Sequence, residues 1–444
     1  MPKDDTRFKI PIMSDKKLLP KHIVIIGGGF AGLRAAKTLS QYSMAHVTLV
    51  DQNNYHLFQP LLYQVATAGL SPADIAVPIR SVIGRFPNIE VILSKVNSID
   101  LGTKTLKTDL RNINYDYLII AAGATHSYFN HPEWEKLAPG LKTLEQATEI
   151  RRRVLLAYEK AEIESDPEIK KALLTFVVVG GGPTGVELAG ALAEISRETL
   201  SKDFKYIDPS QSRIILIEAG ARILTAFDPT LSKKATRDLE NMGVQICTSS
   251  RVSDVQDSYV KLGTDNNSFE KLSTKTVIWA AGVKPSPLAR DLNTPLDKMG
   301  RVMVNQYLHI ENHPDVFVVG DLAHFSVDAE TSLPGLAPVA IQQGEAAAKN
   351  IILALNNKPY KVFKYLDKGM MATIGRKRAI LQIGKIKISG FLAWLAWLFI
   401  HIFYLIDFKN KIFVFMNWCW SYLTFRKGAR LIVGKTTDLQ NNKE

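Results

Sequence analysis

Cysteine is scarce in this sequence of 444 residues, where only Cys247 and Cys419 occur. Two cysteines cannot build the disulfide framework of a small secreted protein, and they cannot supply the thiolates of a cysteine-based metal cluster. They also lack the close spacing of a redox-active Cys-x-x-x-x-Cys pair. We therefore expect no metal site and no chemistry that passes through a disulfide.

The N-terminus lacks the apolar core and the small-residue cleavage site of a secretory signal. It mixes basic residues such as Lys3 and Arg7 with Asp4 and Asp5, whereas a transit peptide avoids acids. We expect residues 1–20 to form a disordered leader and the domain that follows to be cytoplasmic.

A long, uniformly apolar run is also missing. The nearest candidate, residues 388–406, is about long enough to span a bilayer, but it contains His401 and carries Trp394 and Trp397 in its middle. A second segment, residues 412–425, is shorter and flanked by basic residues. We expect two helices lying in one leaflet, with a transmembrane helix and a buried core helix as alternatives.

Charge is unbalanced, with a formal net charge of +12 at pH 7. From Leu366 onward there are thirteen Lys and Arg against four Asp and Glu, and four of the six tryptophans lie in the same region. Basic residues mixed with large aromatic side chains favour an anionic lipid surface over a nucleic-acid groove. We expect a lipid partner and no nucleic-acid partner.

Two copies of a Gly-x-Gly-x-x-Gly turn are the strongest positive signal. The first has Gly27, Gly29 and Gly32, and the second has Gly180, Gly182 and Gly185. Each follows an apolar strand and opens a helix rich in small residues, which is the context in which backbone N–H groups and the helix dipole bind a pyrophosphate. The sequence therefore predicts two bound dinucleotides.

Each turn is followed by a second strand that ends in an acid. Asp51 comes 24 residues after Gly27, and Glu218 comes 38 residues after Gly180 because a surface excursion intervenes. An acid in this position binds ribose hydroxyls, and at Glu218 it would repel a 2′-phosphate. We expect NADH rather than NADPH in the second unit, although Arg222 is close enough in sequence to oppose this choice.

Further strand ends carry small residues where the chain would pass a dinucleotide. These are Gly123 after residues 117–121, Gly282 after residues 276–281, and Gly320-Asp321 after residues 315–319. Asp321 is placed to hold a ribityl hydroxyl of FAD.

These signals predict an α/β fold with two Rossmann-like dinucleotide-binding units and a C-terminal membrane-associated helical segment. We expect the first unit to comprise residues 21–143 and 283–365, and the second residues 144–282. Residues 366–444 form the C-terminal region.

Two further stretches suggest an acceptor site. Residues 53–70 carry aromatic and amide side chains that would line a flavin ring or a quinone tunnel, although packing explains them equally well. Residues 337–349 predict a helix whose N-terminus stabilises negative charge on a reduced flavin, with Gln342 and Gln343 one turn in. Two adjacent glutamines are also common as plain polar surface.

With both glycine turns, Gly320-Asp321, the run 335–344 and the Trp-rich tail in this order, the chain resembles the type II NADH dehydrogenases. These are single-subunit, non-pumping NADH:quinone oxidoreductases of respiratory membranes, and the resemblance covers residues 22–432. It implies FAD in the first unit, NADH in the second, and a membrane quinone, ubiquinone or menaquinone, in a tunnel that ends at the flavin.

The resemblance also assigns residues. The positions implied to bind FAD are Gly27, Gly29, Phe30, Ala31, Gly32, Asp51, Gln52, Val96, Gly123, Asp321 and Ala337. Those implied to bind NADH are Gly180, Gly182, Gly185, Glu218 and Gly282. Glu187 is implied in proton transfer or in linking the two substrate sites, although a glutamate early in a helix is also a good partner for the helix dipole. Gln342 and Gln343 match the amides at the quinone end. The tunnel positions are Gln59, Tyr63, Ile341, Gly390 and Phe391, where Phe391 departs from a lysine of some members.

The implied reaction is hydride transfer from NADH to FAD, followed by two-electron reduction of the quinone without proton pumping. Two rivals stay open: an FAD-dependent reductase of a protein or small soluble acceptor, and a non-catalytic membrane-tethered nucleotide sensor. The expected location is peripheral, on the cytoplasmic face of a bacterial inner membrane, and a homodimer is left open.

Overall fold

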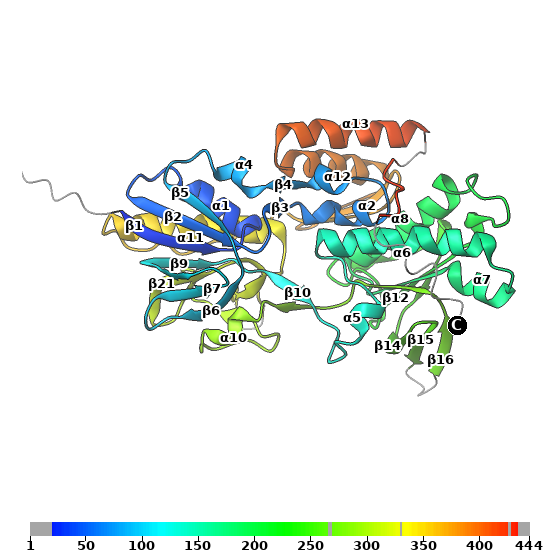
Figure 1. Cartoon of the computed structure of the whole chain (residues 1–444), viewed down its shortest axis with the longest axis horizontal. Helices are drawn as coiled ribbons and strands as arrows, with labels where there is room; N and C mark the ends of the chain where they lie inside the picture. Colours follow the sequence, from blue (N-terminus) through cyan, green and yellow to red (C-terminus); the bar gives the residue numbers. More distant parts are fainter. Residues whose placement is uncertain (1–19, 265–268, 329–330, 425–427, 434–444) are drawn as a thin grey trace, which may run out of the picture.

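The computed structural model describes residues 20–264, 269–328, 331–424 and 428–433. The expected leader, apart from Pro20, lies outside these residues. Figure 1 shows two α/β units side by side, with the C-terminal helices lying over the region where the units meet.

The first unit is built on a six-stranded sheet with the strand order β20-β21-β9-β1-β2-β5. All neighbouring strands are parallel except β20 and β21. The strands are β1 (Lys21–Ile26), β2 (Ala45–Asp51), β5 (Ile89–Leu93), β9 (Tyr117–Ile120), β20 (His309–Ile310) and β21 (His313–Val318). Residues 309–318 thus return to the sheet that residues 21–120 begin.

Both faces of this sheet are buried, which is why its strands read as continuous apolar runs. On one face lie α1 (Phe30–Leu39) and α11 (Ala337–Leu355), which pack so closely that a Cβ on Gly344 would lie 2.1 Å from the carbonyl oxygen of Ala31. On the other face lies the antiparallel sheet of β6 (Val96–Asp100), β7 (Thr105–Thr108) and β8 (Asn112–Asn114).

The second unit repeats the plan with a four-stranded parallel sheet ordered β13-β12-β11-β17. Its strands are β11 (Thr175–Val179), β12 (Arg213–Ile217), β13 (Val244–Cys247) and β17 (Thr276–Trp279). The helices α6 (Leu144–Ile163), α7 (Pro167–Leu173), α8 (Pro183–Glu194) and α9 (Pro229–Asn241) belong to it, as does the antiparallel sheet β14 (Ser250–Gln256), β15 (Tyr259–Thr264) and β16 (Phe269–Ser273).

The chain crosses between the units twice, and the two crossings pair with each other. β10 (Ala124–His126) runs antiparallel to β18 (Val283–Pro285), and β10 lies between the units in Figure 1. Because the two crossings are hydrogen-bonded together, the units share one two-stranded connection.

The C-terminal region begins with an antiparallel sheet and ends in a helical hairpin. Its elements are β23 (Met370–Gly375), β24 (Arg378–Ile383), β25 (Ile386–Ser389), α12 (Phe391–Tyr404) and α13 (Phe408–Thr424). β23 packs on α8, where a Cβ on Gly190 would lie 1.8 Å from the carbonyl oxygen of Ile374. No helix within the described ranges is long and apolar enough to cross a bilayer.

Shorter elements connect these layers. They are β3 (Tyr55–Leu57), α2 (Leu62–Ala66), α3 (Pro72–Ile75), β4 (Ala76–Pro78), α4 (Ile79–Ile83), α5 (Trp134–Leu137), α10 (Leu288–Asp291), β19 (Val302–Met303) and β22 (Ala323–His324), together with 3-10 turns at Gln59–Leu61, Pro209–Gln211 and Gly320–Leu322 and a π-helical turn at Ile195–Thr199. The two predominantly parallel sheets and the C-terminal region that ends in two helices confirm the predicted fold class.

Candidate functional site

The first glycine turn has one tightly packed side and one open side. A Cβ on Gly32 would lie 1.8 Å from the carbonyl oxygen of Gly27, so α1 can approach β1 only without a side chain there. A Cβ on Gly29 would meet nothing within 4 Å. The open side faces a cleft, which is the arrangement that lets a pyrophosphate reach the N-terminus of α1.

Asp51 lies at the end of β2 and supports this turn. Its Oδ2 accepts a hydrogen bond of 2.5 Å from the N–H of Gly28, and its Oδ1 accepts one of 2.7 Å from the N–H of Asn53. Burial raises the pKa of Asp51, and these two N–H groups act in the opposite direction. The carboxylate also borders the cleft, where an acid can bind ribose hydroxyls.

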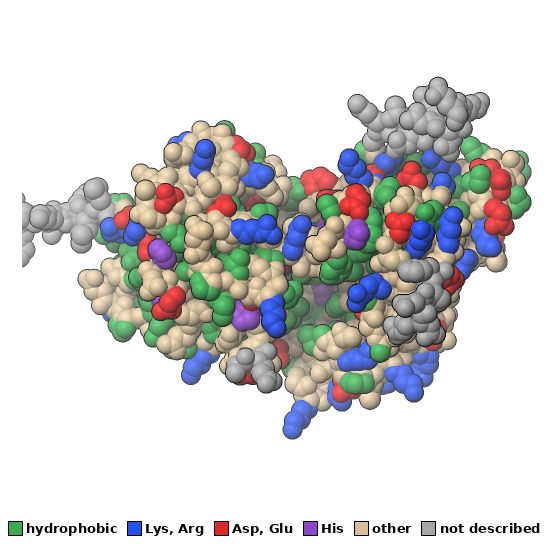
Figure 2. Space-filling model, turned by 90° about the horizontal axis from the view of Figure 1, so that it is seen from below, with side chains coloured by type: hydrophobic (Ala, Val, Ile, Leu, Met, Phe, Trp, Pro, Cys, Tyr) green, Lys and Arg blue, Asp and Glu red, His purple; other side chains and the backbone are tan. Residues whose placement is uncertain are grey.

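The cleft has a volume of about 720 Å³, which is large enough for an extended cofactor. Figure 2 shows the surface hollowed where the two units meet. The cleft brings together most of the positions assigned to FAD from the sequence, along with one assigned to the tunnel: Gly27, Gly29, Phe30, Ala31, Asp51, Gln52, Gln59, Val96, Gly123 and Asp321. The residues present therefore fit an FAD.

Lys142 also lines the cleft and was missed by the sequence analysis. Its Nζ lies 3.6 Å from Oδ2 of Asp321, so a cation sits beside the acid expected at the ribityl chain. No local pattern marks this lysine, because it only precedes the N-cap of α6, Thr143. Its neighbour in space is almost 180 residues away in sequence, and only the fold brings the two together.

Gln343 is 1% exposed and holds the backbone at the end of β21. Its Oε1 accepts a 2.7 Å hydrogen bond from the N–H of Gly320, a residue whose φ of +74° favours glycine. Gln342 instead pairs with Leu366 through both ends of its amide, at 2.9 and 3.0 Å. Both glutamines therefore already bind backbone groups, and their assignment to the quinone end stays a prediction.

The second glycine turn has the same two sides as the first. A Cβ on Gly185 would lie 1.8 Å from the carbonyl oxygen of Gly180, and a Cβ on Gly182 would meet nothing within 4 Å. Gly180 has a φ of +109°, and its own Cβ would lie 2.8 Å from the backbone of Ala280 and Ala281. The open side again lies at the N-terminus of a helix, here α8.

Glu218 occupies the place in this unit that Asp51 has in the first. Its two carboxylate oxygens accept hydrogen bonds of 2.6 Å from the N–H groups of Gly181 and Gly220. Arg222 is turned away from it, because its guanidinium donates to the carbonyl oxygens of Leu224, Thr225 and Phe227. The carboxylate of Glu218 thus lies beside the second glycine turn, at the strand end where an acid can bind a ribose. The guanidinium of Arg222 is already hydrogen-bonded to backbone carbonyl oxygens.

Glu187 lies on α8 and faces the C-terminal region. It borders a small cavity of about 60 Å³ together with Tyr63 of α2 and Trp397 of α12. Its Oε1 accepts a long hydrogen bond of 3.4 Å from the N–H of Thr373, while burial raises its pKa to about 8. At neutral pH this carboxyl group therefore holds a proton, which an ordinary glutamate does not.

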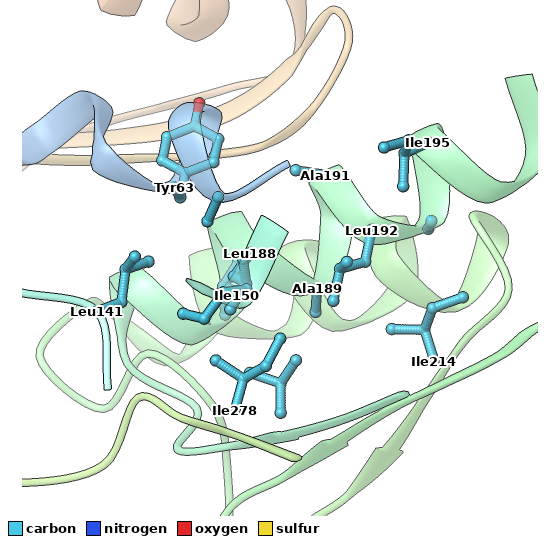
Figure 3. Packing of buried hydrophobic residues seen from close by; sticks show 14 of the residues in the cluster. Tyr63, Leu141, Ile150, Leu188, Ala189, Ala191, Leu192, Ile195, Ile214 and Ile278 are labelled. Carbon is cyan, nitrogen blue, oxygen red and sulfur yellow. The ribbon is translucent and has the colours of Figure 1, made fainter. Parts of the chain in front are cut away.

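Tyr63 lies against α8 rather than on the wall of the large cleft. Figure 3 shows its ring above the buried aliphatic residues of α8, with its hydroxyl pointing away from them. That hydroxyl accepts a 2.9 Å hydrogen bond from Nε2 of Gln64, whose Oε1 accepts one of 2.8 Å from the indole of Trp418. These bonds tie α2 to α13.

A row of aromatic rings runs from the first glycine turn to the C-terminal helices. Phe30 contacts Phe58 at 5.9 Å between ring centroids, and Phe58 contacts His401 at 6.1 Å. His401 stacks on Trp397 at 4.2 Å, and burial lowers the pKa of this histidine to about 4. The first unit and α12 are therefore joined by neutral, close-packed rings.

The remaining assigned positions lie away from the walls of the cleft. Ala337 and Ile341 are half-buried on the first turns of α11, and Gly32 is buried beneath the turn. Gly390 precedes α12 with a φ of +78°, and Phe391 is 50% exposed with its ring stacked on Trp394. The tunnel role assigned to these two residues stays a prediction.

Comparison with known proteins agrees with this geometry. Residues 21–344 match the family described as pyridine nucleotide-disulphide oxidoreductase, and residues 368–427 match the NDH2 C-terminal domain. The chain is 41% identical over 421 residues to the type II NADH:quinone oxidoreductase Ndh of Mycobacterium tuberculosis (strain ATCC 25618 / H37Rv), covering 92% of this chain and 90% of that protein. The chain belongs to the type II NADH:quinone oxidoreductase family.

Other members of this family and of its fold extend the comparison. NdhA of the same bacterium is 40% identical over 427 residues, covering 93% of this chain and 89% of that protein. The structure of NDH2 from Plasmodium falciparum in complex with NADH superposes with a TM-score of 0.84 at 21% identity, covering 94% of this chain and 100% of that one. A sulfide:quinone oxidoreductase from Aquifex aeolicus shares the fold with a TM-score of 0.71, over 88% of this chain and 92% of that one.

Proposed function

We propose that this protein oxidises NADH and reduces a membrane quinone, with one substrate on each side of an FAD held by the first unit. The family supplies the class of reaction, and two nucleotide-binding turns in one chain are the observation that carries the proposal. When bound, FAD supplies the redox chemistry, because its ring accepts a hydride from NADH and passes two electrons to a quinone.

The first unit would hold FAD by three kinds of contact. The open N–H groups of the turn at Gly29 would bind the pyrophosphate, and Asp51 would bind a ribose. Asp321 and Lys142 would bind the ribityl side, where their ion pair leaves both a donor and an acceptor facing the cleft. These groups fix the position of the cofactor, which is the protein's main contribution to the rate.

The second unit would prefer NADH to NADPH. A 2′-phosphate at the ribose would meet the carboxylate of Glu218, and like charges at contact distance repel. Arg222 cannot compensate without giving up its three backbone carbonyl partners. This arrangement supports the preference that the sequence predicts.

Glu187 would serve as the proton reservoir for quinone reduction. It holds a proton at neutral pH, and the small cavity beside it is lined by polar groups that include Glu194 and Arg376. Oxidation of NADH by a quinone takes up one proton beyond the transferred hydride (NADH + H⁺ + quinone → NAD⁺ + quinol), so one carboxyl group with a pKa near the working pH suits the delivery of that proton. The neutral rings of Phe58 and His401 make the packing between the first unit and α12 apolar, which would suit the approach of a lipid-soluble substrate.

The C-terminal hairpin would place the enzyme on the membrane. Several large side chains of α12 and α13 point into solvent, and the most exposed are Phe399, Phe403, Phe408 and Leu423. Lys409 and Lys411 stand at the start of α13, within reach of anionic headgroups. Exposed apolar side chains and lysines on the same helical hairpin favour an anionic lipid surface, and we place it on the cytoplasmic face of a bacterial inner membrane. A homodimer stays a prediction.

The test uses vesicles with a long-chain quinone in the bilayer. We expect wild-type protein to co-sediment with vesicles containing anionic lipid and to oxidise NADH at their surface. The double variant Phe403→Glu, Leu423→Glu should neither bind the vesicles nor oxidise NADH at their surface, because two charges would have to enter the apolar layer of the bilayer. Its turnover with a short, soluble quinone should persist. Tyr206→Glu, at another exposed aromatic residue, is the matched control.

Two outcomes would overturn the proposal. Full activity of the double variant on membrane-embedded quinone would remove the docking role of the hairpin. Failure of the wild-type protein to oxidise NADH with any quinone, while it reduces a soluble protein acceptor, would favour the soluble-acceptor reductase instead.

A further inference from the structure

Phe129 lies on the loop that follows β10 and is 59% exposed. Its aromatic neighbours are buried instead. Tyr128, Trp134 and Trp279 belong to one core cluster, and none of them is more than 6% exposed. Phe129 contacts this cluster through Trp279, at 6.3 Å between ring centroids, but it is not one of the buried members. Its φ of +47° also places it in the left-handed region, which is unusual for a bulky residue. An exposed, strained phenylalanine calls for another explanation than stability.

The ring of Phe129 lies directly on Gly282. A Cβ on Gly282 would be 2.6 Å from Cζ of this ring, so a side chain at 282 would displace the ring, and the φ of +70° at Gly282 independently favours glycine. The loop is held there through Ser127, two residues before the ring. The N–H of Ser127 donates to the carbonyl oxygen of Gly282 at 3.3 Å, and the indole of Trp279 donates to the carbonyl oxygen of Ser127 at 2.9 Å.

Gly282 lies close to the second glycine turn. It follows β17, and the two residues before it are in contact with the glycine turn at Gly180. In the sheet order β13-β12-β11-β17, β11 lies between β12 and β17. The chain passes from β11 to β12 on one side, and it forms β17 on the other side of β11 only later. This is a topological switch point, and dinucleotides bind across the carboxyl ends of the strands at such a point.

The two halves of NADH can be placed from this order. Glu218 ends β12, so the adenosine ribose binds on that side of β11. The nicotinamide half must then cross to the side of β17 and Gly282. From there β18 and β10 lead to the first unit, where the nicotinamide has to arrive. The exposed face of Phe129 stands along this path.

We propose that Phe129 is a contact residue for the nicotinamide half of NADH. The absence of a side chain at Gly282 lets this ring lie beside the nucleotide. The flat apolar ring packs on the ribose and nicotinamide and directs them towards the cleft of the first unit. This inference rests on the proposed function only in that NADH is the donor. It concerns the reductive half of the reaction and is independent of which acceptor follows.

The experiment is anaerobic stopped-flow reduction of the FAD-loaded protein by NADH, which measures the dissociation constant of NADH without any quinone. Phe129→Ala should raise this constant about three- to tenfold, the size of one lost aromatic contact. Phe129→Tyr and Phe129→Trp should restore it to within about twofold, and Phe129→Leu should fall between, because it keeps apolar bulk without a flat ring. Reoxidation by quinone should be unchanged in all four variants.

Tyr206→Ala, at an aromatic residue that is 78% exposed and belongs to neither site, is the matched control and should leave the constant unchanged. The proposal is overturned if Phe129→Ala binds NADH within twofold of wild type, or binds it more tightly, which would make the ring an obstruction. It is also overturned if Tyr and Trp fail to restore binding, or if reoxidation slows in parallel, since both indicate a purely structural role. A wild-type protein that NADH does not reduce would contradict the proposed function itself.

Discussion

Oε1 of Glu187 lies 3.4 Å from the backbone nitrogen of Thr373, and this hydrogen bond joins the nucleotide-binding helix α8 to the first strand of the C-terminal region. The same two elements touch at Gly190 and Ile374. A carboxyl group of the second unit is thus fixed beside the C-terminal region, whose helical hairpin we place on the membrane.

The raised pKa of Glu187 makes the free energy of unfolding depend on pH. Its pKa rises from 4.5 to about 8 on folding because of burial, so the folded protein binds a proton more tightly than the unfolded chain does. The stability from this group is complete below about pH 4.5 and is lost as the pH rises through 8. The loss is on the order of a few kcal/mol. Thermal unfolding between pH 5 and 9 should show this slope in wild type and a flatter profile in Glu187→Gln.

The same substitution tests proton delivery. Glu187→Gln keeps the shape of the side chain but cannot release a proton, so reoxidation by quinone should slow by about 100-fold, the usual contribution of a positioned acid. Reduction by NADH should change little, and separate measurement of the two half-reactions checks this. Equal slowing of both halves would contradict the assignment of Glu187 to the quinone side.

The paired glycine turns give a test of which nucleotide each unit binds. Gly29 and Gly182 have φ angles of −70° and −72°, which alanine adopts freely, and both have open space where a Cβ would go. Gly29→Ala should therefore fold but lose FAD, and Gly182→Ala should keep FAD but bind NADH about tenfold or more weakly, since a methyl group would stand where the pyrophosphate approaches. Flavin content and NADH titration measure the two effects.

Gly32→Ala is the contrasting variant. Its methyl group would lie 1.8 Å from the carbonyl oxygen of Gly27, so α1 would have to move away from β1. We expect loss of thermal stability as well as of FAD. If Gly29→Ala and Gly32→Ala behaved alike, the distinction between the packed and the open side of the turn would be wrong.

Coenzyme choice depends on Glu218. Replacement by glutamine removes the charge that faces the ribose, so the ratio of kcat/KM for NADPH to that for NADH should rise about tenfold or more. The double variant Glu218→Gln with Arg222→Ala should behave like the single one if the arginine takes no part in binding, as its three backbone partners indicate. A further loss of NADPH use in the double variant would show that Arg222 reaches the phosphate.

The parts of the site that could be predicted from sequence are those set by local geometry. A strand, a tight glycine turn and a helix are contiguous, so Gly27 and Gly180 could be recognised without knowing the rest of the fold. The acids Asp51 and Glu218 end the next strand along the chain, and parallel strands bring their ends to one edge.

The parts that could not be predicted depend on contacts between distant segments. Lys142 meets Asp321, and Phe129 meets Gly282, only because the chain crosses twice between the units. The hydrogen bond from the N–H of Gly320 to Oε1 of Gln343 could not be predicted either, and the assignment of Gln343 to the quinone end stays a prediction. A polar side chain buried on a helix serves either purpose, and the sequence does not distinguish them.

The central claim is that one bound FAD is reduced from the second unit and reoxidised by a quinone. Its most direct test is the absorption spectrum of the FAD-loaded protein under anaerobic conditions, titrated first with NADH and then with quinone. We expect the oxidised flavin bands to bleach with one equivalent of NADH and to return in full with one equivalent of quinone. Bands that do not bleach, or that bleach and do not return with quinone, would contradict the account.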